Sequence, residues 1–261
     1  MIKFFRHIRR SLIQKNQMGK YFKYAIGEIL LVVIGILIAL QINTWNSSRI
    51  DSAKEKEYLH NLLDDIKIQK SIVDAQIQHE NKMRFKCEKA LVNLNSKSIS
   101  VDSLNTYLTD ITRKSFVINN PTFQDLKSSG NILLIKDTKL RNKILSFYQY
   151  LDYSALVVQT NNLKSISEFR DYLLKNNVVD MNYKDTFKVA GGVDWSLKSV
   201  DVRWANEIIA SQLKDKKFLL ELLNTVSQRG RATSVNLDLM ERMERRIETI
   251  QTEINNYLIN D

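Results

Sequence analysis

Few side chains in this sequence have the types and spacing that catalysis or metal binding would need. The three histidines are His7, His60 and His79, and only His60 is followed at one helical turn by a carboxylate, that of Asp64. His60 and His79 lie 19 residues apart, about 100° apart around a helix, so they do not share a narrow face. The one cysteine, Cys87, excludes an internal disulfide and any cysteine-based zinc or iron-sulfur site.

Recognised catalytic motifs are also missing. The sequence contains no phosphate-binding loop, no nucleophile elbow and no His-Glu-x-x-His zinc motif. The His60 and Asp64 pair is better explained as part of a solvated helix face than as a metal site. We therefore predict that the protein is not an enzyme, and we expect no catalytic residue, no metal and no cofactor.

Glu28 is the acidic residue with the most unusual surroundings. It lies in the stretch 25–42, whose only other strongly polar member is Gln41. Eighteen residues of helix span about 27 Å, just enough for the hydrocarbon core of a bilayer. A cleaved signal peptide is the alternative, but its apolar region is shorter and ends in a small-x-small site, which Leu40 to Asn43 does not provide. The stretch predicts one uncleaved transmembrane helix.

Within that helix, Glu28 shares a face with two small residues. At 100° per residue, Glu28, Gly35 and Ala39 lie within about 20° of a common line. Small residues let two helices approach closely, so this face could pack against a partner. Glu28 could instead reach the head groups and pair with Lys20 or Lys23, thereby setting the depth of the helix. A third interpretation is coupling to ion movement, the usual role of acids inside a membrane.

Most of the net charge of +10 lies at the N-terminus. Residues 1–24 contain seven basic and no acidic side chains, whereas the rest of the chain has 32 basic and 29 acidic residues. This distribution argues against nucleic-acid binding and predicts a cytoplasmic N-terminus at an anionic inner leaflet. The basic residues expected at the membrane surface are Lys3, Arg6, Arg9, Arg10, Lys15, Lys20 and Lys23, and the expected interface anchors are Tyr21, Tyr24 and Trp45.

The tail itself has helical periodicity. Ile2, Phe5, Ile8 and Leu12 recur at helical spacing with arginines between them, which is typical of a basic amphipathic helix lying on a membrane. A disordered tail that acts only during insertion is the alternative.

Two blocks of sequence resemble a known family. The first runs from Tyr24 through Gly27 and Glu28 to the exit Gln41-Ile42-Asn43-Thr44-Trp45-Asn46, and the second begins at Leu126-Lys127-Ser128-Ser129-Gly130-Asn131. They are similar to motifs of a bacterial family of single-pass membrane proteins that is known only as a domain of unknown function. The resemblance implies a location in the inner membrane of Gram-negative bacteria, and it implies no reaction.

The composition favours an all-α fold. Glycine and proline together account for eight of 261 residues, against a usual share of about 12%, so there is too little turn chemistry for a many-stranded sheet. We expect a cytoplasmic tail at 1–24, a transmembrane helix at 25–43 and a periplasmic domain at 44–261. The periodicity of this domain predicts an elongated antiparallel bundle of coiled-coil-like helices at 50–94, 102–113, 121–129, 137–177, 202–212 and 216–259.

Three polar residues interrupt the apolar seam of the first long helix. Gln69, Gln76 and Glu80 occupy seam positions between Leu59 and Leu94, and Cys87 occupies another. So many polar positions are unusual in a dedicated two-stranded zipper. They favour packing against other helices of the same chain over a free coiled coil.

The segment 178–200 does not have the rhythm of the bundle. It contains Gly191, Gly192 and Trp195, with Trp204 just beyond, which could form a partner-binding loop or place a tryptophan as a plug at one end of the bundle. Val178 and Val179 could pair with residues 187–190 as a small ribbon.

Together these features predict a scaffold, adaptor or accessory subunit of an envelope complex that acts by helix packing. Its expected partners are further copies of itself or other membrane and envelope proteins. The alternative is a stator-like or transport-associated subunit that uses Glu28 for proton coupling. A sensor is less favoured, because 24 residues cannot hold a cytoplasmic output domain.

Overall fold

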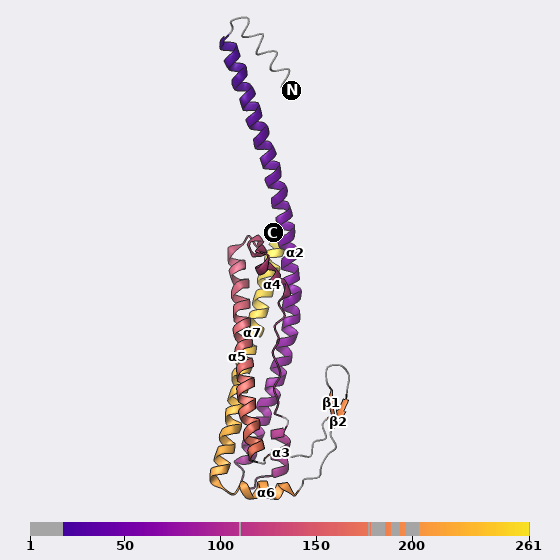
Figure 1. The fold of residues 1–261 in the computed structure, drawn as a ribbon, viewed down its shortest axis with the longest axis vertical. Helices are drawn as coiled ribbons and strands as arrows, with labels where there is room; N and C mark the ends of the chain where they lie inside the picture. The colour runs from indigo at the N-terminus through magenta and orange to yellow at the C-terminus, as the bar shows by residue number, and fades with distance from the viewer. Residues whose placement is uncertain are drawn as a thin grey trace. The chain divides into compact units, whose positions relative to one another are not determined.

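The computed structural model describes residues 18–109, 111–176, 178, 186–188, 194–196 and 204–260. The chain divides into two compact units, Met1–Tyr58 and Leu59–Asp261, which are considered separately below. The fold is all-α, as predicted, and the long helices of the second unit run alongside one another (Figure 1).

The described part of the first unit is helical throughout. It forms the beginning of α2, a helix that covers Met18–Leu94. Within α2, an apolar window of 18 residues has a mean hydropathy of 2.6, and none of this window is buried in the protein. By length and composition this helix could therefore cross a membrane.

Three long helices form the core of the second unit. They are the part of α2 from Leu59 onward, α5 (Thr138–Lys175) and α7 (Lys216–Asn260), and α5 and α7 pack against each other. The predicted α2 seam is confirmed, since all its members from Leu59 to Leu94 are buried. On α5, residues spaced three or four positions apart also form the buried face, which contains Leu140, Ile144, Phe147, Leu151, Val158, Asn162, Ile166, Phe169 and Leu173.

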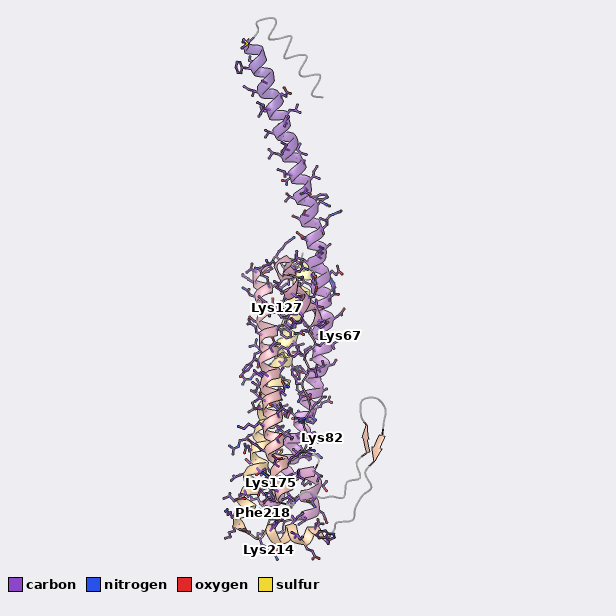
Figure 2. All side chains as sticks on the ribbon, viewed as in Figure 1. Lys67, Lys82, Lys127, Lys175, Lys214 and Phe218 are labelled. Carbon is purple, nitrogen blue, oxygen red and sulfur yellow. The ribbon has the colours of Figure 1, made fainter. Side chains whose placement is uncertain are left out.

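Short helices close the ends of the bundle. Helix α3 (Val101–Thr109) contacts α6 (Ala205–Gln212), and α4 (Pro121–Ser128) is followed by the 3₁₀ turn η1 (Asn131–Leu134). Gly130 directly precedes η1, and its φ of 75° is a conformation that favours glycine. Figure 2 shows Lys127 of α4 at one end of this unit and Lys175, Lys214 and Phe218 at the other.

One predicted helix is too long. The sequence predicts helix over 102–113, but α3 ends at Thr109, and residues 111–120 are neither helix nor strand. This connection lies along the bundle, and its backbone groups bond to side chains of the long helices, as described below. Pro121 is the first residue of α4, a position that suits proline, and the Asn120 side chain makes no capping hydrogen bond.

The predicted ribbon forms with a different partner strand. Residues Thr186–Lys188 (β1) pair antiparallel with Asp194–Ser196 (β2), with Phe187 opposite Trp195. Val178 lies in no strand, and Val179 lies outside the described residues. A short connection containing Gly191 and Gly192 separates the two strands in the sequence, which is a hairpin signal and needs no distant partner.

Candidate functional site

The face of α2 that contains Glu28, Gly35 and Ala39 is continuous helix in the structure. A methyl group added at Gly35 would have no heavy atom of the described chain within 4 Å. No side chain of the described residues therefore fills the notch that Gly35 leaves, which stays open to lipid or to another helix.

The predicted membrane-surface and interface residues are only partly described. Lys3, Arg6, Arg9, Arg10 and Lys15 lie outside the described residues, as do the side chains of Lys20, Tyr21 and Tyr24. Lys23 is exposed. Trp45 is 64% exposed, and the guanidinium carbon of Arg49 lies 5.7 Å from the centre of its ring.

The residues of the predicted partner loop are also only partly described. Gly191 and Gly192 lie outside the described residues, and Trp195 is placed only by its backbone in β2. Trp204 precedes α6 and is 65% exposed, so it does not plug the end of the bundle.

Polar side chains of α2, α5 and α7 meet in the interior of the bundle. Oε1 of Glu80 accepts hydrogen bonds from the side-chain amides of Gln76 (2.9 Å) and Asn236 (3.1 Å). The Asn236 amide also lies 3.2 Å from the side-chain oxygen of Asn162, and all four residues are buried. We call Gln76, Glu80, Asn162, Arg229, Thr233 and Asn236 the polar layer.

Arg229 brings a cation into this layer. Its side chain is 1% exposed, and its guanidinium donates to Oγ1 of Thr233 at 2.8 Å and to the carbonyl oxygen of Thr112 at 3.0 Å. Burial lowers the pKa of Arg229, and the charge of Glu80 opposes that shift. Burial also raises the pKa of Glu80, whereas its hydrogen bonds and the positive charge of Arg229 act to lower that pKa. The two buried charges thus compensate each other in part.

The connection between α3 and α4 is fastened by side chains of α2. The backbone N–H of Asn119 donates to Oε1 of Gln69 at 2.7 Å, and its side-chain amide donates to the carbonyl of Asp65 at 3.1 Å. The N–H of Thr122 donates to the Asp65 carboxylate at 2.9 Å. These bonds explain why the polar residue Gln69 occupies a seam position of α2, because buried backbone groups outside a helix need partners.

The middle of the connection is held from α2 and α5. Nζ of Lys114 donates to the carbonyl of Ala75 at 3.1 Å, and the amide of Asn162 donates to the carbonyl of Lys114 at 3.2 Å. The bond from Arg229 to Thr112 adds α7, so all three long helices form hydrogen bonds with this connection. It is therefore a packed element of the bundle, although it has no regular secondary structure.

Burial shifts the pKa values of His79 and Cys87. Burial lowers the pKa of His79, which also lies near the cations Arg229 and Lys114. Burial raises the pKa of Cys87 to about 11. Among the described residues, no group of three or more His, Cys, Asp or Glu side chains is placed to hold a metal ion.

Arg229, Thr233 and Asn236 are interior residues that the apolar pattern of the sequence does not mark. A signal was present, because they continue the three-and-four spacing of Leu222 and Val226 on α7. Because the three residues are polar, this spacing by itself does not place them in the interior, and the signal that does is the matching set of polar positions on α2.

Comparison with known proteins gives one match. No curated protein and no solved structure matches the chain. The family described as "Family of unknown function (DUF6090)" matches residues 28–194, which include the Glu28 face, the α2 seam, the fastened connection and α5. On this match over more than half of its length, the chain belongs to the DUF6090 family of unknown function.

Proposed function

We propose that the protein is a single-pass inner-membrane protein whose helical bundle lies in the periplasm and serves as a scaffold, adaptor or accessory subunit. It acts by contact with other membrane or envelope proteins, or with further copies of itself, and not by catalysis. The N-terminal tail lies on the cytoplasmic leaflet.

The observation that carries this proposal is the exposed apolar stretch of α2. Isoleucine, leucine and valine side chains from Ile26 to Ile42 are between 44% and 63% exposed. So continuous an apolar surface is unfavourable in water, and a bilayer would cover it. The seven basic residues before it favour a cytoplasmic N-terminus.

Two features support action by contact. The notch at Gly35 is open in the described chain, and a notch of this kind suits close approach of a second helix. Trp204 is 65% exposed beside α6, and exposed tryptophans are frequent centres of protein interfaces.

Site-specific photo-crosslinking in cells tests the contact role. A photoreactive residue at Gly35 should capture a defined partner, and one at Leu37, about 200° around the helix, should not. A second photoreactive residue at Trp204 examines the bundle. The proposal fails if neither position gives a crosslink and the purified full-length protein is a monomer.

Reporter fusions test the topology separately. Alkaline phosphatase fused after Asp261 should be active and a fluorescent protein there should stay dark, whereas fusions before Met1 should give the opposite pattern. A fluorescent C-terminal fusion would overturn the orientation.

A proton-coupled role predicts a different result at one residue. Glu28→Gln removes the ionisable group and leaves shape and volume almost unchanged. A scaffold should keep its Gly35 crosslinks and its partners with this substitution. Loss of a transport or motor phenotype while the complex remains assembled would favour the stator-like alternative.

A further inference from the structure

Two adjoining hollows lie beside the C-terminal half of α5. The smaller has a volume of about 170 Å³ and is walled by Leu108, Ile111, Phe169 and Leu173. The larger, about 440 Å³, is lined by Thr112, Arg113, Ser167 and Asp171. Arg170 and Leu174 line both hollows, so the two form one groove with an apolar end and a polar end.

The polar end is positively charged. Arg113 and Arg170 contribute two guanidinium groups, and Asp171 contributes the single carboxylate of the lining. Neither arginine makes a hydrogen bond or ion pair with another residue in the described part of the chain, and both are exposed. Behind the lining, the buried Arg229 donates to the carbonyl of Thr112. The groove therefore has unused capacity to bind an anion.

The apolar end has an exposed leucine at its mouth. Leu174 is 65% exposed although it adjoins the buried side chains Phe169 and Leu173. An alkyl chain lying in the smaller hollow would cover Leu174 and remove apolar surface from water.

We propose that this groove binds an amphiphile with one anionic head group and a single alkyl chain, such as a fatty acid or an alkyl phosphate. Arg113 and Arg170 bind the carboxylate or phosphate through charge-assisted hydrogen bonds, with the Ser167 hydroxyl as an additional donor. The alkyl chain occupies the hollow between Leu108, Ile111 and Leu173. The larger hollow is within the range of roughly 300–1,000 Å³ that small-molecule sites occupy.

This inference goes beyond the proposed function and does not depend on it. If the groove bound no amphiphile, the scaffold would still show its crosslinks from Gly35. If Gly35 captured no partner, the bundle could still bind an amphiphile in the groove. The two proposals can therefore fail separately.

The test uses the full-length protein in phosphatidylcholine nanodiscs and a decanoate analogue with a photoreactive diazirine in its chain. Labelled peptides are mapped by mass spectrometry. We expect saturable labelling of residues 108–113 and 166–174. Unlabelled decanoate and decyl phosphate should both displace the probe, and the more effective of the two identifies the preferred head group.

Three further competitors separate the contributions of head and chain. Decanol lacks the charge and inorganic phosphate lacks the chain, so both should displace the probe poorly. The third competitor is a peptide that ends in two leucines, which presents an anionic carboxyl group on a protein-like ligand. The proposal is overturned if decanol matches decanoate, if phosphate alone displaces the probe fully, or if only the peptide does.

Variants assign the effect to the groove. Replacing both arginines by glutamine, Arg113→Gln with Arg170→Gln, should weaken saturable labelling by tenfold or more, since each charged hydrogen bond contributes about a factor of ten. Leu174→Asn should weaken it less. Arg231→Gln, at an exposed position of α7 outside the groove lining, is the matched control and should label as wild type. Unchanged labelling in the double variant, with unchanged circular dichroism, would refute the site.

Discussion

The guanidinium of Arg229 donates a 3.0 Å hydrogen bond to the carbonyl oxygen of Thr112, 117 residues away in the sequence. Arg229 lies inside the bundle, and Thr112 lies in the connection between α3 and α4. This bond joins the polar layer of the long helices to a segment that has no hydrogen-bonding pattern of its own. It is the contact on which the first prediction depends.

Arg229→Met should destabilise the bundle strongly. The substitution leaves the Thr112 carbonyl and the Glu80 carboxylate without their cationic partner in the interior, which typically costs about 3 kcal/mol or more. Unfolding by urea in detergent micelles, followed by circular dichroism, measures the loss. Hydrogen exchange should also become faster in residues 111–119. Arg231→Met, at an exposed position two residues on, is the control, and an equal loss in both variants would contradict the role of Arg229.

Glu80→Gln should change how stability depends on pH. Burial raises the pKa of Glu80 in the folded state, so the folded protein binds the proton more tightly than the unfolded chain does. Its contribution is therefore fully present below the ordinary glutamate pKa and is lost as the pH rises through the raised value. Glutamine has no proton to lose and keeps an oxygen that can accept from Gln76 and Asn236.

The expected result is a melting temperature that falls less with increasing pH in Glu80→Gln than in the wild type. Thermal melts of the full-length protein between pH 4 and pH 8 give the comparison. Asp238→Asn removes an exposed carboxylate of α7 and serves as the control. Parallel pH profiles for wild type and Glu80→Gln would show that Glu80 does not titrate in this range.

Gly230→Ala should stabilise the protein. Gly230 lies inside α7, where alanine is favoured over glycine by about 1 kcal/mol. The added methyl group would lie 3.4 Å from Cβ of Cys87, an ordinary van der Waals contact. We expect the melting temperature to rise by roughly 2–4 °C. Gly230→Val adds branched bulk against Cys87 and should lower it, and a loss in the alanine variant would show that the contact is too tight.

Cys87 should react slowly with thiol reagents. Its side chain is 1% exposed, and burial raises its pKa to about 11, so on the order of one thiol in a thousand is ionised at pH 8. Ser96→Cys in a Cys87→Ala background places a thiol at an exposed turn and should be labelled at least 100-fold faster by a maleimide. In denaturant the two thiols should react at similar rates. Fast native labelling of Cys87 would show that the core opens around it.

The periodicity of the sequence determines most of the helices. The seams of α2 and α5 predict their buried faces, because apolar residues that recur every three or four positions can be covered only along one side of a helix. Local signals also place several ends. Pro121 begins α4, Gly130 follows it with a positive φ, and Asp137 caps α5 by accepting from the N–H groups of Lys139 and Leu140.

The connection at 111–120 and the polar layer could not be predicted in the same way. Helical periodicity extends the α3 prediction to Arg113, but the backbone after Thr109 bonds instead to side chains of α2, α5 and α7. Those partners are distant in the sequence, so no local pattern contains them. The groove with Arg113 and Arg170 arises for the same reason, since one arginine comes from the connection and the other from α5.

The sequence by itself thus determined an all-α chain with one apolar stretch and a basic N-terminus, because composition and periodicity act within a few helical turns. The tertiary structure alone decided which polar residues are interior. Glu80, Asn162 and Asn236 hydrogen-bond to one another only after three helices meet, and a buried polar group is stable only where such partners exist.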